Sequence, residues 1–331
     1  MRGNRNTAGL EMIVTRLTER FGLHHPIVLA PMGGVAGGRL AAAVANAGGL
    51  GLVGGGYGDR EWMTRELALV KAHTAGAWGV GLITWSISPG ILELALAQQP
   101  RAVMLSFGDP RPHAAAIRSA GCALICQVQG RDEARLAQEA GADFIVAQGT
   151  EAGGHGASRA TLPLVPTIVD FVAPTPVIAA GGIVDGRGVS AALMLGADGA
   201  LMGTRFCAST EALGRERAKQ RLVAAHGGET ARTRVFDIVR DYAWPAPYTG
   251  RALRNDFMAR FDGREDALVS TLDVERVAYR KAADADDYDT ALVWAGEGVD
   301  LVTTIEPAGT LVTRIGDDAE SRLRDGGRLL R

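Results

Sequence analysis

Cysteine is scarce in this sequence. Three cysteines occur among 331 residues, at Cys122, Cys126 and Cys207, and none of them forms a Cys-x-x-Cys pair. Neither a disulfide framework nor a zinc site is therefore indicated, and we expect no bound metal ion. Free cysteines are typical of a reducing compartment, so we expect a cytoplasmic protein.

Long apolar runs and an excess of positive charge are also missing. No stretch reaches the roughly 18 consecutive apolar residues of a membrane-spanning helix, and charges spread along residues 1–22 argue against a signal peptide. The formal net charge of −2 gives no broad positive field for nucleic acid or an anionic membrane. We therefore expect a small-molecule partner and neither nucleic acid nor membrane, with a homodimer left open as the assembly.

Short apolar runs and helix-like segments alternate along the chain. Hydrophobic residues make up 47% of the sequence and charged residues 22%, the balance of a globular protein with a large core. Five helix-like segments end in Ala-Gly or Leu-Gly just before an apolar run, which is typical of a glycine C-cap before a buried strand. The runs predict eight strands, at residues 26–32, 49–54, 78–84, 102–107, 123–128, 143–148, 176–181 and 199–204.

Eight strand and helix units within about 180 residues predict a closed (β/α)8 TIM barrel, because an open doubly wound sheet usually has fewer strands. An open sheet remains the alternative. The alternation stops near Gly214, where charge rises. We therefore divide the chain into a barrel over residues 1–213 and a helical C-terminal region over residues 214–331 that packs on the substrate side of the barrel.

In a parallel barrel the site forms where the strands end, so the residues after each apolar run are the candidates. Glycines after the last two strands predict a phosphate site, because their N–H groups can approach an anion. We assign Gly181, Gly182, Gly203 and Thr204 to it. The sequence has no G-x-G-x-x-G fingerprint or P-loop lysine at the required place, which favours flavin mononucleotide (FMN) over a dinucleotide or ATP.

The flavin ring is expected to reach across the barrel from this phosphate site. The residues expected beside the ring are Ala30, Pro31 and Met32, together with Gly149 and Gly153 of the loop after the sixth strand.

His155 follows the sixth strand within the loop Glu-Ala-Gly-Gly-His-Gly. A solvated or helix-capping histidine is the alternative, but the neighbouring glycines keep bulk away and place the imidazole beside the predicted cofactor. We therefore predict that His155 is catalytic, as a proton acceptor or as a cation that holds an anionic substrate. Glu151 would either orient this histidine or hold the loop through backbone hydrogen bonds.

Two further residues near the predicted rim have open assignments. Arg205 follows the predicted phosphate turn, where it could contact the phosphate or form a salt bridge under the rim. Trp85 follows the third strand and is expected at the wall of the pocket.

Four segments together resemble the nitronate monooxygenase family, formerly called 2-nitropropane dioxygenases. They are PIVLAPMGGVAGGRLAAAVANAGGLGLVGGG, AQGTEAGGHGA, PVIAAGGIVDGRGVSAALMLGADGALMGTRF and WPAPYTGRALRN. The resemblance implies an FMN-containing barrel that oxidises alkyl nitronates with O2 to a carbonyl compound and nitrite, with His155 at the reacting end. It also implies that Gly81, Gln127 and Gln148 belong to the residues that bind the flavin. One position departs from the family pattern, since Gly81 stands where many relatives have an asparagine that reaches the flavin.

Fold resemblance alone leaves the reaction open. The same superfamily includes flavin-dependent enoyl-acyl-carrier-protein reductases and NADH:quinone reductases, so the alternative function is NAD(P)H-dependent reduction of a quinone or an enoyl thioester. A third possibility is a barrel without turnover whose task is assembly or regulation.

Overall fold

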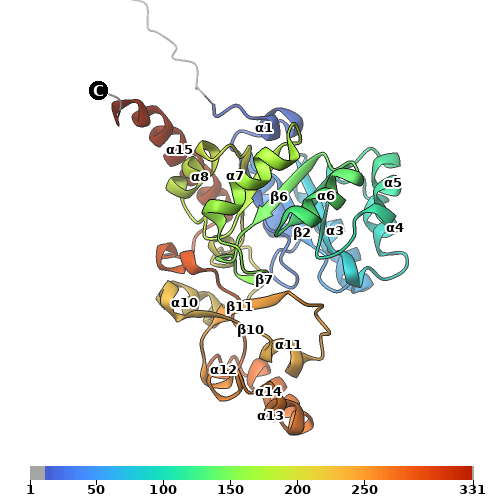
Figure 1. Ribbon diagram of the computed structural model, residues 1–331, viewed down its shortest axis with the longest axis vertical. Helices are drawn as coiled ribbons and strands as arrows, with labels where there is room; N and C mark the ends of the chain where they lie inside the picture. Colours follow the sequence, from blue (N-terminus) through green and yellow to red (C-terminus); the bar gives the residue numbers. More distant parts are fainter. Residues whose placement is uncertain (1–11, 330–331) are drawn as a thin grey trace, which may run out of the picture.

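The computed structural model describes residues 12–329, and its centre is a ring of eight parallel strands in the order β1-β9-β8-β6-β5-β4-β3-β2 (Figure 1). The ring closes between β1 and β2 through the bridge of Val28 to Leu50 and a hydrogen bond of 2.9 Å from Leu29 N to Leu50 O. The eight predicted runs all form these strands, and the predicted (β/α)8 barrel is confirmed. The strands are β1 (Ile27–Leu29), β2 (Gly51–Gly54), β3 (Trp78–Ile83), β4 (Ala102–Ser106), β5 (Ala123–Val128), β6 (Phe144–Gln148), β8 (Val177–Ala180) and β9 (Gly199–Met202).

Helices follow the strands and cover the outside of the ring. Several end at a glycine with positive φ, for example Gly121 (74°) and Gly141 (73°), as the glycine junctions predict. The helices of the barrel are α2 (Gly38–Asn46), α3 (Arg60–His73), α4 (Ile91–Leu96), α5 (Arg111–Ser119), α6 (Arg131–Glu139), α7 (Thr161–Val172), α8 (Gly186–Met194) and the short α9 (Thr204–Cys207).

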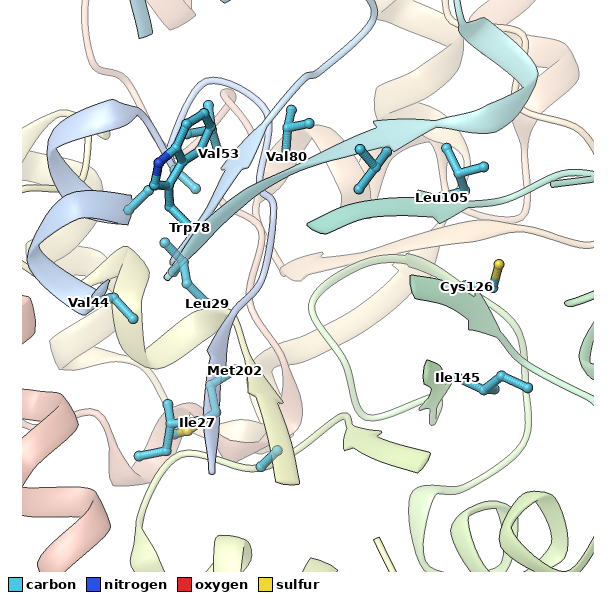
Figure 2. Close-up of a cluster of buried hydrophobic side chains, with 14 of the residues drawn as sticks. Ile27, Leu29, Val44, Val53, Trp78, Val80, Leu105, Cys126, Ile145 and Met202 are labelled. Carbon is cyan, nitrogen blue, oxygen red and sulfur yellow. The ribbon is translucent and has the colours of Figure 1, made fainter. Parts of the chain in front are cut away.

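The strands separate two apolar clusters, because successive side chains of a strand point to opposite faces. In β4, Val103 and Leu105 belong to the cluster shared with the helices, which Figure 2 shows in part. Ala102 and Met104 alternate with them and belong to the cluster inside the ring. Each buried leucine or valine stabilises the fold by about 1.5–3 kcal/mol. A shift of one residue would move every side chain of a strand to the other face, so the packing on both faces fixes the register.

The helix α1 (Arg16–Phe21) closes the end of the barrel at which the strands begin. Leu17 and Phe21 pack inside the ring, and the rings of Phe21 and Phe144 lie 5.6 Å apart between centroids. Arg16 Nη2 binds Asp198 Oδ2 at 2.6 Å and fastens the helix to the turn before β9. Because this end is filled, a ligand can enter only at the end where the strands finish.

The C-terminal region forms a lobe over that open end (Figure 1). Besides helices it contains two antiparallel strands, β10 (Thr230–Thr233) and β11 (Thr249–Leu253), so the expectation of a purely helical region is wrong. A third strand, β7 (Gly154–Gly156), comes from the loop that carries His155 and pairs with β11. The helices of the region are α10 (Glu216–Ala224), α11 (Val235–Arg240), α12 (Asp256–Phe261), α13 (Glu265–Ser270), α14 (Leu272–Asp284) and α15 (Ala308–Gly326).

The last helix leaves the lobe and returns to the barrel. Ser190 Oγ of α8 donates a hydrogen bond of 3.1 Å to Ala319 O of α15, and Gly186 lies against Ala319 and Asp318. The C-terminal lobe is thus inserted between α9 and α15, so both of its ends are fixed to the barrel.

No helix among residues 12–329 has the length and apolar character needed to cross a membrane. The N-terminal segment that argues against a signal peptide includes residues 1–11, which lie outside the described residues.

Candidate active site

A cavity of about 490 Å³ opens where the strands end and extends under the C-terminal lobe. Twelve of the thirteen predicted site residues line it: Ala30, Pro31, Met32, Gly81, Gln127, Gln148, Gly153, His155, Gly181, Gly182, Gly203 and Thr204. The exception is Gly149, whose Cα faces α7, since a Cβ there would lie 2.0 Å from Thr161 Oγ1. Gly149 therefore permits close packing of the loop, and it is not among the cavity-lining residues.

The glycines after β8 and β9 form a cradle of backbone donors. Gly181 and Gly182 have φ angles of 111° and 71°, a conformation that favours glycine. Within residues 12–329, the N–H groups of Gly182, Gly203 and Thr204 have no hydrogen-bond partner, although these residues line the cavity. Unpartnered N–H groups around a concave surface suit a phosphate group, so the cradle fits the phosphate of a flavin.

Buried amides and a proline turn also line the cavity. Gln127 and Gln148 lie on the neighbouring strands β5 and β6, where Gln127 Nε2 donates to Gln148 Oε1 at 3.1 Å. Gly81 faces Pro31, and a Cβ on Gly81 would lie 2.2 Å from Pro31 Cγ. The absence of a side chain at residue 81 is therefore required by the position of the Pro31 turn.

His155 is held by a carboxylate from the C-terminal lobe. Its Nε2 lies 2.9 Å from Asp237 Oδ1 and 3.0 Å from Oδ2, and both side chains are buried. The ring stacks on Trp244 with centroids 3.5 Å apart and meets the edge of Trp294. Because an ionised carboxylate only accepts hydrogen bonds, Nε2 donates, and the neutral ring keeps its lone pair on Nδ1.

Burial lowers the pKa of His155 below its ordinary value of 6.5. The hydrogen bond and the charge of Asp237 oppose this effect, whereas the charges of Arg240 and Arg232 add to it. The imidazole is therefore neutral at physiological pH and can accept a proton at Nδ1, which has no hydrogen-bond partner among the described residues.

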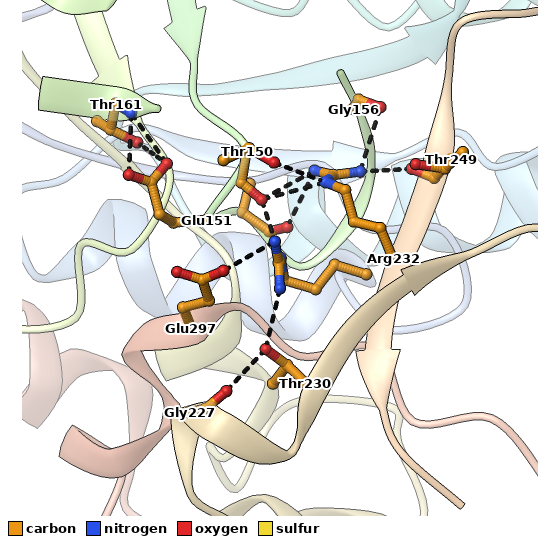
Figure 3. A network of polar contacts seen from close by, with 11 residues as sticks. Thr150, Glu151, Gly156, Thr161, Gly227, Thr230, Arg232, Thr249 and Glu297 are labelled. Carbon is orange, nitrogen blue, oxygen red and sulfur yellow. Dashed lines mark hydrogen bonds and ion pairs between the residues drawn. The ribbon is translucent and has the colours of Figure 1, made fainter. Parts of the chain in front are cut away.

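Arg232 fixes the ends of the His155 loop, residues 149–156 (Figure 3). Its Nη1 donates to Gly156 O at 3.1 Å and to Thr249 O at 2.6 Å, while Nε donates to Thr150 Oγ1 at 3.0 Å. Burial, reinforced by the charge of neighbouring Arg251, lowers the pKa of Arg232 to about 10. The guanidinium remains charged and ties β7 to β11.

Glu151 and Arg251 also hold this loop in place. Glu151 accepts from Thr161 N and Thr161 Oγ1, so it holds the loop against α7 and makes no contact with His155. Arg251 donates to Thr150 O at 2.9 Å and pairs with Glu297 at 2.8 Å. Of the two roles open to Glu151, the structure shows the loop-holding one, and the histidine takes its carboxylate from Asp237.

An aromatic wall defined by Tyr57, Tyr242 and Trp244 encloses the outer part of the cavity. Tyr57 stacks on Tyr242 with centroids 3.8 Å apart, and Trp244 Nε1 donates to the Tyr57 hydroxyl at 2.8 Å. Burial raises the pKa of Tyr57 to about 12, so its hydroxyl stays protonated. Trp85, which was expected at the wall of the pocket, does not line the cavity. Its ring packs edge-on against Trp244, with the centroids 5.3 Å apart.

Arg205 is directed away from the predicted phosphate cradle. Its Nη2 donates to Thr304 O at 2.6 Å, and Glu306 lies 4.0 Å away. The side chain is 2% exposed and is not among the residues that line the cavity. The ion pair under the rim, and not the phosphate contact, is the alternative that the structure shows.

Comparison with known proteins decides the family. The model of the family described as nitronate monooxygenase matches residues 14–90 and 90–318. The chain belongs to the nitronate monooxygenase family. It is therefore a flavin-dependent oxidoreductase that acts on a small molecule, as the resemblance of the four segments implies.

Individual relatives include a nitronate monooxygenase and an enzyme named for a different activity. A nitronate monooxygenase of Neurospora crassa is 33% identical over 90% of both chains. A (3aS,4S,5R,7aS)-5-hydroxy-7a-methyl-1-oxo-octahydro-1H-indene-4-carboxyl-CoA dehydrogenase of Mycobacterium tuberculosis is 38% identical over 67% of this chain and 63% of its own length.

Solved structures show the same fold. FabK from Thermotoga maritima has a TM-score of 0.86 at 28% identity and covers 96% of this chain and 100% of its own. Nitroalkane oxidase from Streptomyces ansochromogenes has a TM-score of 0.80 at 29% identity, with 93% and 99% covered.

Sequence reasoning missed every site residue of the C-terminal lobe. Asp237, Arg240, Tyr242, Trp244 and Trp294 all reach the cavity or His155. They follow no strand of the barrel, so the rule that selects residues at strand ends could not find them. The one signal was the segment of residues 244–255, which resembles the nitronate monooxygenase family.

Proposed function

We propose that the protein uses FMN to oxidise alkyl nitronates with O2 to a carbonyl compound and nitrite. The observation that carries this proposal is the buried pair of His155 and Asp237 at the same cavity that the glycine cradle lines. We assign the phosphate of FMN to Gly181, Gly182, Gly203 and Thr204. The ring would lie beside Ala30, Pro31, Met32, Gly81, Gln127, Gln148 and Gly153, with Gly149 supporting the loop behind them.

FMN supplies the electron acceptor and the reaction with O2, and the protein supplies orientation, charge and proton transfer. His155 Nδ1 is placed to take a proton from the carbon beside a nitro group, which extends the substrates to neutral nitroalkanes. Asp237 then stabilises the imidazolium that forms. The aromatic wall of Tyr57, Tyr242 and Trp244 excludes water from the reacting carbon.

Residues 214–331 act in this proposal as the substrate-side region, and residues 1–213 act as the flavin-binding barrel. This division is made by role and not by packing, because α15 belongs to residues 214–331 but packs on the barrel.

The first experiment is an anaerobic titration of the purified flavoprotein, with a nitronate in one cuvette and NADH in another. Flavin released by denaturation is identified by mass as FMN or otherwise. We expect the nitronate to bleach the flavin and nitrite to appear once air is admitted. Bleaching by NADH alone would refute the proposal.

That second outcome would favour an NAD(P)H-dependent reductase of a quinone or an enoyl thioester. Two likenesses favour this second function. FabK shares the fold of this chain, and the CoA dehydrogenase is similar in sequence over 67% of it. Absence of flavin reduction by every donor would favour the assembly or regulatory role.

A further inference from the structure

The end of the C-terminal lobe that lies farthest from the barrel carries exposed valines. α13 and α14 form this end (Figure 1). Val269 of α13 and Val274 and Val277 of α14 are 57%, 73% and 67% exposed. Among residues 12–329, ten large hydrophobic side chains are exposed, and three of them fall within residues 269–277. Single exposed valines are ordinary, but several on adjoining helices indicate a contact with another protein.

One face of α14 packs on the lobe and the opposite face is free. Tyr279 is the buried residue of the helix, and it lies among the apolar side chains of the lobe. With 3.6 residues per turn, residues spaced by four form a row along a helix. Asp273, Val277 and Lys281 form such a row on the side of α14 away from Tyr279, and all three are exposed.

The charges beside Val277 have no partner in the part of the chain that the structure describes. The side chains of Asp273, Arg280 and Lys281 form neither a hydrogen bond nor an ion pair among residues 12–329. Glu275 and Arg276, by contrast, both form ion pairs within the lobe. The unpaired charge on either side of Val277 is therefore negative toward the start of α14 and positive toward its end.

We propose that this face of α14 binds the same face of a second copy of the chain, with the two helices antiparallel and Val277 on the twofold axis. Residues 273 and 281 each lie about 6 Å from Val277 along the helix. Asp273 of each copy therefore meets Lys281 of the other. A twofold interface requires a surface that complements itself in this way. The inference does not depend on the reaction proposed above.

The antiparallel arrangement brings no like charges together. Arg280 would lie opposite Val274 of the second copy, where its methylene groups cover the valine. Asp284 would lie opposite the neutral Ser270. A parallel arrangement would instead place each charge opposite its own copy, which is repulsive. None of these residues lines the cavity, so the contact does not involve the active site.

The test measures self-association of the purified holoprotein by sedimentation velocity. A contact made by one helix and its neighbour is at the small end of protein interfaces, so we expect a dissociation constant of about 1–100 µM. The concentration series must span this range. The proteins are wild type, V277D, D273K, K281D and the double variant D273K/K281D. M194D is the matched control, because Met194 is an exposed apolar residue on the barrel helix α8.

Wild type is expected to form a dimer. V277D should raise the dissociation constant at least about 100-fold, because it places two carboxylates together on the axis. D273K and K281D should each raise it about 10-fold by pairing like charges. The double variant reverses the pair and should return to within about threefold of wild type. M194D should match wild type.

A wild type that stays monomeric at every concentration would overturn the inference and would leave the valines to a different partner. A dimer that survives V277D would overturn it as well, since another surface would then hold the copies together. So would single charge variants whose loss the double variant does not restore. Recovery in the double variant also separates lost contact from lost folding, because it carries both substitutions.

Discussion

Replacing Asp237 by asparagine tests the pair at the centre of the site. The substitution keeps the size of the side chain and removes its charge, so the contacts of 2.9 and 3.0 Å with His155 Nε2 lose their charge assistance. An amide can also present its N–H2 group to Nε2, which would move the imidazole proton to Nδ1 and remove the free lone pair.

The size of the effect follows from the strength of one hydrogen bond to a charged group. Such a bond contributes about 1.5–3 kcal/mol, and it is strongest when the imidazole becomes a cation. At about 1.4 kcal/mol for each factor of ten, D237N should reduce the rate of flavin reduction by a nitroalkane by about 10- to 150-fold. Flavin binding should be unchanged, because Asp237 is not among the residues that line the cavity.

The pH dependence of the rate gives a second test of the role of Asp237. Asp237 raises the pKa of His155 against the larger lowering by burial, so its removal lowers that pKa further. A proton acceptor must be neutral, so the rate of wild type should rise with pH below 6.5 and then level off. In D237N the rise should move to still lower pH, and the plateau should be lower.

Anaerobic stopped-flow measurement of flavin bleaching between pH 5 and 9 records both effects. The control is D241N, which alters an exposed aspartate on the same segment that contacts Arg276 and not His155. A D237N enzyme with the plateau and the pH profile of wild type would refute the role assigned to the pair.

Three further substitutions have defined outcomes. H155A should retain FMN but lower nitronate turnover by about two to four orders of magnitude; steady-state nitrite release measures this, and unchanged turnover would remove His155 from the mechanism. G81A should lower the free energy of unfolding by about 1–3 kcal/mol, because its Cβ would lie 2.2 Å from Pro31 Cγ; urea denaturation tests this, and wild-type stability would show that the Pro31 turn moves freely. R232M should raise hydrogen exchange in residues 149–156, because it removes the bonds of Arg232 to the loop; unchanged exchange would show that other contacts suffice.

The barrel could be predicted from the sequence because each of its strands is marked by the composition of one short run of residues. Residues 102–105 and 144–147 are continuous apolar runs, and a strand buried on both faces has that composition wherever it lies in the ring. Once the strand ends are known, the topology alone brings Gln127, Gly182 and Thr204 to one rim. Twelve predicted residues consequently lie at one cavity.

The C-terminal lobe was not readable in this way. β7 has three residues, two of them glycine, and it is a strand only because β11 lies beside it. β10 reads Thr-Ala-Arg-Thr, which has no apolar face to mark it. Its Arg232 is half-buried and bonds to Thr150 O, 82 residues away in the chain. Asp237 is likewise identified only by its contact with a histidine 82 residues away.

The pairing of β7 with β11 has a consequence for protein engineering. The loop that carries His155 forms β7, which is the edge strand of the sheet in the C-terminal lobe. The loop and the lobe therefore form one unit that should be exchanged together. A chimera that imports the lobe of a relative with another substrate should take residues 149–161 along with residues 214–307. Importing the lobe alone would separate the imidazole from its carboxylate and leave Arg232 facing a foreign loop. The natural crossover points lie between α9 and α10 and before α15, where barrel and lobe meet without sharing a sheet.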